Sequence, residues 1–420
     1  MADRQITYTK AHERIASLDF LRGVAILGIL FINVENFAYP DSWSPYKYGF
    51  ESAVDHDVRF WVYFLTQGKF YSMFALLFGV GFYLFLERLE RKGIGLRALD
   101  IYARRLLWLF VIGVLHAYLV WDGDVLYHYA ICGFLLFPFR SMKTARLLGV
   151  IALLCVLVLQ GAYVQVEKRQ DWKAAYAEAM AVPEEARSEK EQKSISFWEK
   201  RSGPGSPDTA TVAPRKETYL IGLQESYEHI GVLKGTLYYR SLLFRSLLLM
   251  LLGIVLYRAG IFANYRVWRH YWLLTLLLLA AGLTVNYIRY YHWTYTYYPP
   301  VTSLWQEWLF TFPKELLGFA YVLLLNGLYQ KYLHRIRWKA ISAVGRMALS
   351  NYLFQNVVLG LLFYGYGLGL YNQFARGDLL WVVLSVWVVQ VMLSALYLRR
   401  YAQGPVETLW KRLTYTSLKQ

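Results

Sequence analysis

The chain has 420 residues, of which 57% are hydrophobic and only 18% are charged, whereas a soluble domain of this size is about half apolar and about a quarter charged. The formal net charge is +16, but the basic residues lie between long apolar blocks, which argues against nucleic-acid binding and for an all-α polytopic membrane protein. The first 17 residues are polar and predict no cleavable signal peptide.

Ten apolar segments predict transmembrane helices, since a span needs about 20 mostly apolar residues. The predicted spans are 18–37, 68–87, 105–121, 125–140, 147–166, 238–257, 271–288, 308–328, 341–363 and 379–398. Lysine and arginine concentrate in alternate loops, as they do on the cytoplasmic side of membranes. We therefore expect a multi-pass protein of the bacterial plasma (inner) membrane, embedded in the lipid bilayer, with both termini in the cytoplasm.

Residues 167–237 are polar and separate the spans into two groups of five. The predicted organisation is an N-terminal five-helix membrane half (1–166), an extracytoplasmic loop (167–237) and a C-terminal five-helix half with a cytoplasmic tail (238–420). Within the loop, 171–180 predicts a short amphipathic helix, and 201–215 is too polar to order itself. The loop fits an acceptor-side lid or a tolerated insertion equally well.

The first predicted helix carries polar residues on one face, and polar groups inside a span are costly. Asp19 and Arg22 are three residues apart and are expected to pair. Arg22 and Asn33 are eleven residues apart, which on a helix is about 20° off one stripe and roughly 16 Å along the axis. This face predicts a polar cavity wall. The alternative is a packing stripe with an anchoring arginine.

The third predicted helix places His116 in its outer half, and an acidic turn with Asp122 and Asp124 follows. A histidine near two carboxylates is the usual arrangement of a general base with an orienting acid. A buried histidine bonded to a neighbouring helix is the alternative. His56 and His128 also lie on the outer side and are weaker candidates.

Further polar residues lie inside or at the ends of predicted spans. They are Lys69, Glu315, Arg346, Ser350, Asn351 and Gln355. Lys314 and Glu315 are adjacent, so they point about 100° apart and can serve different walls of one cavity. No metal site is predicted, because no histidine or cysteine cluster has ligand spacing.

Six motifs follow one another along the chain: LDFLRGVAILGILFIN, GKFYSMFALLFGVGF, GVLHAYLVWDGDVL, PKEL, VGRMALSNYLFQ and GPVETLWKRLTY. Together they resemble the YeiB family of bacterial membrane proteins, over nearly the whole chain except 167–237. The family is defined by a domain of unknown function. The resemblance therefore implies a membrane fold but no particular activity.

The LDxLRG-like start of the first helix also resembles, more distantly, the transmembrane acyltransferases. These include heparan-α-glucosaminide N-acetyltransferase and bacterial enzymes that O-acylate surface polysaccharides. In the polysaccharide acylators an arginine is followed eleven residues later by a catalytic histidine, but here Asn33 stands at that place. In the heparan enzyme an asparagine stands there and the catalytic histidine lies in the following outer loop, where this chain has His56.

The resemblance favours acyl transfer from cytosolic acyl-CoA to an extracytoplasmic small-molecule, glycan or lipid acceptor, with no metal and no nucleic acid. Arg22, Arg104 and Arg105 would hold the phosphates of CoA. Asp19 would orient Arg22. The oligomeric state, a homodimer included, stays open.

In this hypothesis His116 takes the proton of the acceptor, oriented by Asp122 or Asp124, and Asn33 donates to the developing oxyanion. The reading requires that Arg22, Asn33 and His116 share one polar chamber. A transporter of small molecules or lipids could use the same cavity. In a non-catalytic scaffold, Asp19 and Arg22 would only fix helix packing.

Overall fold

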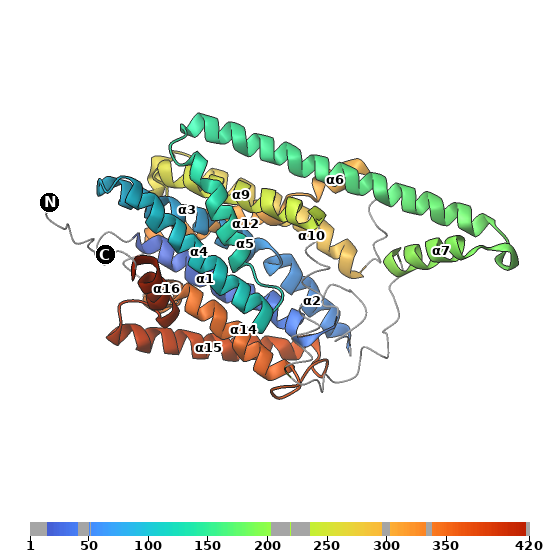
Figure 1. Ribbon diagram of the computed structural model, residues 1–420. Helices are drawn as coiled ribbons and strands as arrows, with labels where there is room; N and C mark the ends of the chain where they lie inside the picture. Colours follow the sequence, from blue (N-terminus) through green and yellow to red (C-terminus); the bar gives the residue numbers. More distant parts are fainter. Residues whose placement is uncertain are drawn as a thin grey trace.

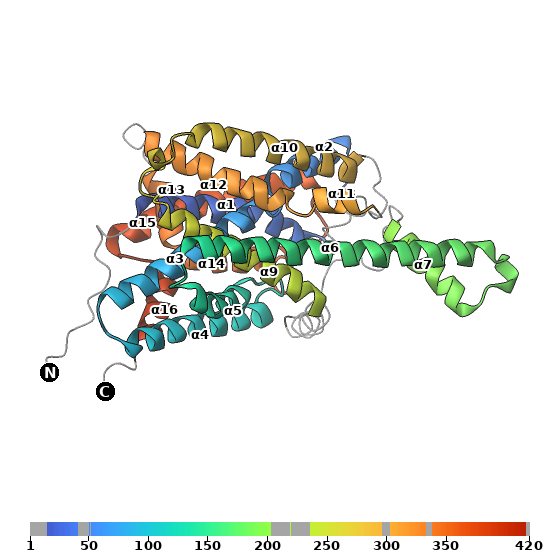
Figure 2. The same cartoon turned by 90° about the horizontal axis from the view of Figure 1, so that it is seen from above.

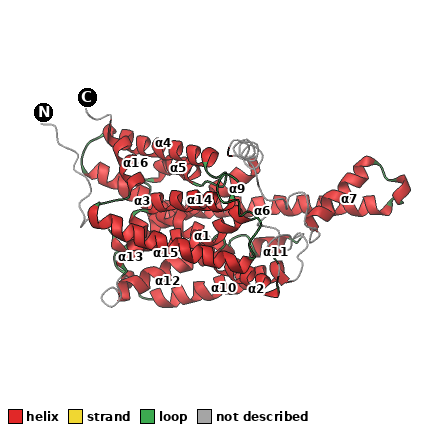
Figure 3. Cartoon of the chain, turned by 90° about the horizontal axis from the view of Figure 1, so that it is seen from below, coloured by secondary structure: helices red, strands yellow, loops and turns green. Residues whose placement is uncertain are grey.

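The structure, a computed structural model, describes residues 15–40, 50, 52–202, 219, 236–295, 303–332 and 338–416. Within these ranges all regular structure is helical (Figure 3), so the expected all-α fold is confirmed. The flexible run expected at 201–215 lies outside the described residues, apart from its first two positions.

The helices have the following bounds. They are α1 (Ala16–Ala38), α2 (Ala53–Thr66), α3 (Lys69–Arg91), α4 (Leu96–Leu119), α5 (Leu126–Leu136), α6 (Thr144–Ala181), α7 (Glu189–Ser202), α9 (Thr236–Arg258), α10 (Tyr271–Tyr295), α11 (Leu304–Leu309), α12 (Pro313–Tyr332), α13 (Lys339–Arg346), α14 (Ala348–Phe363), α15 (Arg376–Arg400) and α16 (Pro405–Tyr415).

Each predicted span coincides with helical structure. Among the described residues, six helical stretches are long and apolar enough to cross a membrane: Ala16–Ala38, Ala53–Arg91, Thr144–Ala181, Tyr271–Tyr291, Leu304–Tyr332 and Arg376–Arg400. Shorter apolar helices lie at Leu126–Phe139 and Ala348–Phe363. Because a helix satisfies its backbone hydrogen bonds internally, such segments can cross lipid. The chain is therefore a multi-pass membrane protein.

Two local features differ from the predicted spans. The segment predicted as one span at 341–363 is two helices, because α13 ends at Arg346 and α14 begins at Ala348. Helix α2, which was not predicted, precedes α3 and turns into it through Gly68. Gly68 has a φ of +77°, and a Cβ there would lie 2.6 Å from Cδ of Lys314. The turn therefore needs glycine both for its backbone conformation and for its close packing.

Helix α6 is a continuous helix of 38 residues, and the separate amphipathic helix predicted at 171–180 is its last part. At 1.5 Å per residue it is about 57 Å long, against a hydrocarbon core of roughly 30 Å. Its end projects from the bundle, and α7 packs back along it (Figure 1). Trp172 meets Phe197 and Tyr176 meets Trp198, with ring centroids 5.0 and 6.2 Å apart.

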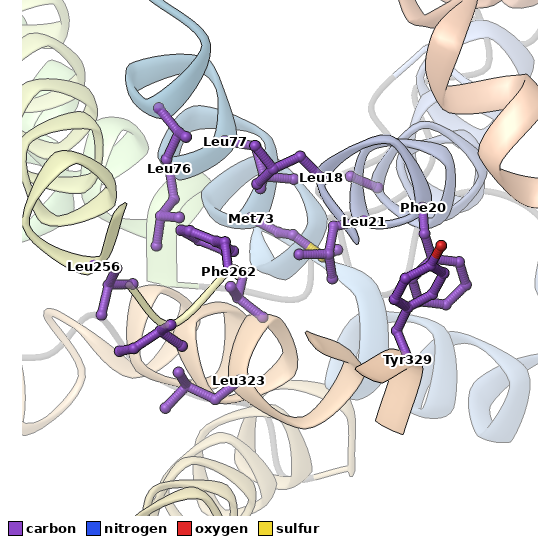
Figure 4. Close-up of a cluster of buried hydrophobic side chains, with 14 of the residues drawn as sticks. Leu18, Phe20, Leu21, Met73, Leu76, Leu77, Leu256, Phe262, Leu323 and Tyr329 are labelled. Carbon is purple, nitrogen blue, oxygen red and sulfur yellow. The ribbon is translucent and has the colours of Figure 1, made fainter. Parts of the chain in front are cut away.

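Helix α1 lies in the middle of the bundle, with α3 and α12 on one side and α14 and α15 on the other (Figure 1). Seen from above, α1 lies between α12 and α14 (Figure 2), and it also packs against α13. The two groups of helices predicted from the chain order therefore interleave in space. Leu18 and Leu21 of α1 pack with Met73 and Leu77 of α3 and with Leu323 of α12 (Figure 4). In lipid, such close packing, more than escape from water, holds helices together.

Two glycines let α1 and α13 approach closely. A Cβ on Gly345 would lie 1.8 Å from the Asp19 carbonyl oxygen, and one on Gly23 would lie 2.1 Å from the Ile341 carbonyl oxygen. Small residues at a helix crossing permit such backbone contact. The crossing fixes the first turns of α1, which carry Asp19 and Arg22, against the break between α13 and α14.

The bundle has two distinct ends (Figure 1). One end holds α16, the start of α1 and the turn between α3 and α4, and it is called the α16 end below. The projecting α6–α7 arm marks the opposite end, called the α7 end. Because α1 runs from the α16 end toward the α7 end, Arg22 and Asn33 lie at different depths of the molecule.

Candidate functional site

An internal cavity of about 1350 Å³ is lined by residues from both ends of the bundle. Helices α1, α3, α4, α6, α9, α10, α12 and α16 all contribute to its wall. Arg22 and Asn33 both line it, so the polar face of α1 meets a chamber rather than lipid. Charged side chains gather in two groups along this cavity.

The first group, the α16-end cluster, consists of cationic side chains with two carboxylates. Its members are Arg22, Arg88, Lys92, Arg105, Arg346 and Lys411, with Asp19 and Glu407. The predicted pair is confirmed, with Arg22 Nη1 3.4 Å from Asp19 Oδ1. The Arg105 guanidinium lies between the rings of Phe85 and Trp410, 4.6 and 3.7 Å from their centroids. This stacking holds its plane in a fixed orientation.

Glu407 is hydrogen-bonded to the start of α14. Its Oε1 accepts the backbone N–H groups of Leu349 and Ser350 at 2.8 and 3.1 Å, and its Oε2 accepts the Ser350 hydroxyl at 2.5 Å. A carboxylate at the N-terminus of α14 satisfies unpaired amides and the helix dipole. The Glu407 carboxylate is thus already hydrogen-bonded to the start of α14. The surrounding cations give this end of the cavity its positive charge.

The second group, the α7-end cluster, is built from five helices. Its members are Arg169, Arg245, Arg289 and Lys314, with Glu307 and Glu315. Arg245 Nη1 lies 2.5 Å from Glu315 Oε1, and Arg169 Nη1 lies 2.8 Å from Glu307 Oε2. Arg289 donates to the Phe310 carbonyl at 2.5 Å. Charged groups inside an apolar bundle are costly, which makes this cluster a candidate functional position.

Asn33 presents a donor that the protein itself does not use. The residue is only 7% exposed, and its Nδ2 is buried without a hydrogen-bond partner. A buried polar group left unsatisfied costs about 1–3 kcal/mol. Because Asn33 lines the cavity, a ligand or water in the chamber can accept this hydrogen bond.

His116 is not among the residues that line the cavity, so the prediction that it shares one chamber with Arg22 and Asn33 is wrong. Its Nδ1 is 2.8 Å from Asp124 Oδ1, and its Nε2 is 3.1 Å from Asn356 Nδ2. Since an amide nitrogen only donates, Nε2 accepts and Nδ1–H donates to Asp124. Tyr352 lines the cavity in front of the pair, with its ring 5.3 Å from that of His116.

Asp124 is the carboxylate that orients His116, and it also begins α5. Its Oδ2 accepts the backbone N–H groups of Leu126 and Tyr127 at 2.8 and 3.2 Å. The side chain is fully buried, whereas Asp122 is partly exposed. Of the two carboxylates in the acidic turn, Asp124 fixes both the His116 ring and the start of α5.

Of the other predicted residues, Glu315 and Arg346 line the cavity, while Arg104 does not and pairs with Asp100 at 2.8 Å. Lys69 is fully buried, donates to the Tyr63 carbonyl at 2.9 Å and lies over the Tyr290 ring.

Ser350, Asn351 and Gln355 connect helices within the bundle. Asn351 donates to the Val344 carbonyl at 3.0 Å, and Gln355 donates to the Ile26 carbonyl at 3.1 Å. Ser350 donates to Glu407. His56 stacks on Phe50, with ring centroids 4.4 Å apart.

One buried hydrogen-bonded network was not predicted from the sequence. The Ser246 hydroxyl lies 2.7 Å from that of Tyr71 and 2.9 Å from His128 Nε2. Arg245, next to Ser246, was also missed as a cavity residue. The available signal was an arginine and a serine inside the apolar segment 238–257, which only functional or packing demands retain at that depth.

Several helices long and apolar enough to cross a membrane, arranged around a charged cavity, define this chain as a multi-pass membrane protein with a polar internal cavity. It belongs to the YeiB family, whose C-terminal part is described as "Protein of unknown function (DUF418)" and matches residues 256–417.

Several relatives match nearly the whole chain. "Uncharacterized protein YxaH" of Bacillus subtilis (strain 168) is 31% identical over 97% of this chain and 96% of its own length. "Uncharacterized protein YeiB" of Escherichia coli (strain K12) is 30% identical over 96% of both chains. The comparison with solved structures found no match. The similarity to acyltransferases stays a prediction.

Proposed function

We propose that this protein is a transmembrane acyltransferase. It transfers an acyl group, such as acetyl, from cytosolic acyl-CoA to an acceptor on the extracytoplasmic side of the bacterial plasma membrane. The observation that carries the proposal is one cavity whose wall holds a basic cluster at each end of the bundle. A reaction between a cytosolic donor and an external acceptor needs such a shared chamber.

The orientation follows from charge. The α16 end carries the arginine-rich turn between α3 and α4 and the start of α1, and positive residues favour the cytoplasmic side. In this arrangement the ten spans run N-in and C-in, the helices of 1–166 and 238–420 surround the cavity, and the α6–α7 arm within 167–237 is extracytoplasmic. The donor then enters at the α16 end.

The α16-end cluster binds the phosphates of CoA. Arginine forks match phosphate oxygens in pairs, and the stacked Arg105 and the Asp19-held Arg22 present theirs at the cavity wall. The acyl arm then extends along α1 toward Asn33, which lies roughly 16 Å farther along the helix axis. Arg104 has no part in this site, because its partner is Asp100 on the same helix.

Asn33 stabilises the charge that develops during transfer. The acceptor oxygen or nitrogen attacks the thioester carbonyl, a bond from acceptor to acyl carbon forms, and the carbon–sulfur bond to CoA breaks. The carbonyl oxygen becomes negative in between, and the buried Nδ2 of Asn33 supplies a hydrogen bond to it. A pre-placed donor in a dry site is worth roughly 10²–10³ in rate.

The proton of the acceptor leaves through Tyr352. Tyr352 lines the cavity, and its hydroxyl lies 3.4 Å from Asp124 Oδ1. The hydroxyl accepts the acceptor's proton and passes its own to Asp124, and a proton returns by the same path to the departing CoA thiolate. Asp124 is thus the proton acceptor, His116 the positioning residue that donates to it through Nδ1–H, and Tyr352 the contact to substrate.

The test uses the full chain in proteoliposomes. Radiolabelled acetyl-CoA is added with an extract of the bacterial envelope, and label on the protein and on extracted acceptors is counted. Saturable binding of acetyl-CoA and acetylation of an envelope compound are expected. Absence of both would end the proposal.

Transport of a small molecule or lipid is a second candidate, and one feature favours it. The break at Met347 between α13 and α14 lies beside the lining residues Arg346 and Ala348, and transporters often bind substrates at interrupted helices. Uptake of envelope metabolites into proteoliposomes without CoA is the measurement. Uptake that is saturable and independent of acyl-CoA would replace acyl transfer with transport.

A further inference from the structure

We propose that the hydroxyl of Tyr129 binds an amide of the pantetheine arm of CoA in the aromatic middle of the cavity. The inference rests on the proposed function for the identity of the donor. It adds a residue that recognises the arm, whereas the arginines of the α16-end cluster recognise the phosphates. A ligand with a plain hydrocarbon chain in place of the arm would make no use of this hydroxyl.

One stretch of the cavity wall, called the aromatic row below, consists of phenylalanines. Phe70, Phe74, Phe78 and Phe82 of α3 are spaced four residues apart, and all of them line the cavity. Residues at this spacing lie above one another on neighbouring turns of a helix. From Phe70 to Phe82 the row covers about 18 Å along the helix axis. A ligand that extends between the ends of the bundle therefore lies against the row.

The aromatic row separates the two parts of the proposed reaction site. A Cβ on Gly81 would lie 2.8 Å from Arg22 Nη2, and one on Gly28 would lie 2.4 Å from the Phe70 ring. One end of the row is thus next to the phosphate-binding Arg22. Asn33 lies beyond the other end, about 7.5 Å past Gly28 along α1. A donor that reaches from Arg22 to Asn33 must pass the row.

Tyr129 of α5 packs against the middle of the row. Its ring centroid lies 5.8 Å from that of Phe74 and 4.9 Å from that of Phe78. The residue lines the cavity and is fully buried, and its hydroxyl has no hydrogen-bond partner among the described residues. The Tyr71 hydroxyl acts on it electrostatically but is hydrogen-bonded to Ser246. Tyr129 thus brings an unused polar group to an apolar part of the wall.

The arm of CoA needs a polar group at this place. The arm begins with a branched apolar unit, continues through secondary amides and ends at the sulfur. An amide in a dry apolar passage is unfavourable unless it is hydrogen-bonded. A phenol hydroxyl can donate to the amide oxygen or accept from the amide N–H. Binding of the arm therefore satisfies the Tyr129 hydroxyl and the amide together, while the aromatic row packs against the apolar unit.

The experiment measures equilibrium binding to the full chain in phosphatidylcholine nanodiscs. The probes are CoA and adenosine diphosphate, which has the adenosine and diphosphate of CoA but lacks the arm. Tyr129→Phe should weaken CoA binding roughly tenfold, because an amide of the arm loses its hydrogen bond in a dry site. Binding of adenosine diphosphate should not change. Equal affinity of the variant and the wild type for CoA would overturn the assignment, and so would an equal loss for both probes.

Tyr102→Phe is the matched control. Tyr102 is also buried, but it does not line the cavity, and its hydroxyl donates to the Gly133 carbonyl at 2.7 Å. This variant should keep its affinity for CoA and should show a lower Tm, because a hydrogen bond is lost. Tyr129→Phe without ligand should keep the Tm of the wild type, since no hydrogen bond within the chain is removed. A lower Tm of Tyr129→Phe would mean that the hydroxyl is already bonded, and the proposal would fall.

Transfer of label from acetyl-CoA, measured on the same samples, separates this inference from the proposed function. If CoA binding depends on Tyr129 but no envelope compound is acetylated, the arm site stands and the transfer step is contradicted. If acetyl is transferred while Tyr129→Phe binds CoA like the wild type, acyl transfer stands and the arm lies elsewhere. If CoA does not bind at all, both ideas fall.

Discussion

The side chains of α1 and α4 show what a sequence can and cannot place. Helical geometry predicted that Arg22 and Asn33 share a face, and both line the cavity. It could not predict that Tyr352, from a helix more than two hundred residues away, lines the cavity with its ring beside that of His116. Periodicity gives the direction of a side chain on its own helix, but the neighbour that covers it depends on packing.

Adjacent arginines on α4 give a matched test of the donor site. Arg105→Gln should weaken acetyl-CoA binding about tenfold, because one charge-assisted contact to phosphate is lost. Arg104→Gln should bind like wild type, since Arg104 pairs with Asp100 outside the cavity. Equilibrium binding of labelled acetyl-CoA is the measurement. Equal losses in both variants would contradict the assignment.

The acidic turn gives a second matched pair. Asp124→Asn should lower kcat by roughly 10²–10⁴ with little change in KM for acetyl-CoA, because the carboxylate that receives the proton is lost. The asparagine amide oxygen can still accept the backbone N–H groups of Leu126 and Tyr127, so the start of α5 should survive. Asp122→Asn should keep most of its activity. Rates of transfer in proteoliposomes decide the matter, and an Asp124→Asn enzyme with normal kcat would exclude the pair from catalysis.

At the scale of elements, the crossing of α1 and α13 depends on small residues. Neither Gly23 nor Gly345 could be assigned this role from the sequence, because the partner backbone lies more than three hundred residues away. The close approach holds the Asp19–Arg22 pair beside Arg346. Packing between distant helices thus fixes the position of the α16-end cluster.

Gly345→Ala tests this crossing. Its Cβ would lie 1.8 Å from the Asp19 carbonyl oxygen, so the helices must separate, and overpacking of this kind costs about 1–3 kcal/mol. Gly149→Ala on α6 is the control, because a Cβ there meets nothing within 4 Å. Thermal unfolding in detergent should show a lower Tm for Gly345→Ala alone. A Tm unchanged from wild type would mean that the crossing is looser than described.

For the whole molecule, hydropathy predicted where helices form but not how they assemble. All ten apolar segments coincide with helices, because length and composition decide which segments enter lipid. The break at Met347 and the extension of α6 were missed, since both depend on contacts beyond a local window. The interleaving of the two groups of helices around α1 could not be predicted either, because a hydropathy profile contains no information about which helices pack together.

The orientation of the whole molecule can be measured by adding one cysteine at a time to a Cys155→Ser background, in which the remaining Cys132 is buried. Gln192→Cys, on the exposed face of α7, should react with a membrane-impermeant maleimide in intact cells. Arg97→Cys, exposed near the start of α4, should react only after permeabilisation, because the proposed orientation puts the α16 end in the cytoplasm. The reverse pattern would invert the topology and with it the donor side.

The unbroken course of α6 has a mechanical consequence. The same helix that packs against α9 inside the bundle carries Gln165, Arg169 and Trp172 at the cavity wall and α7 at its far end. Because α6 is one continuous helix, its projecting end and its part of the cavity wall are directly connected. A force applied to the projecting end of α6 would therefore also move the part of the cavity wall that this helix carries.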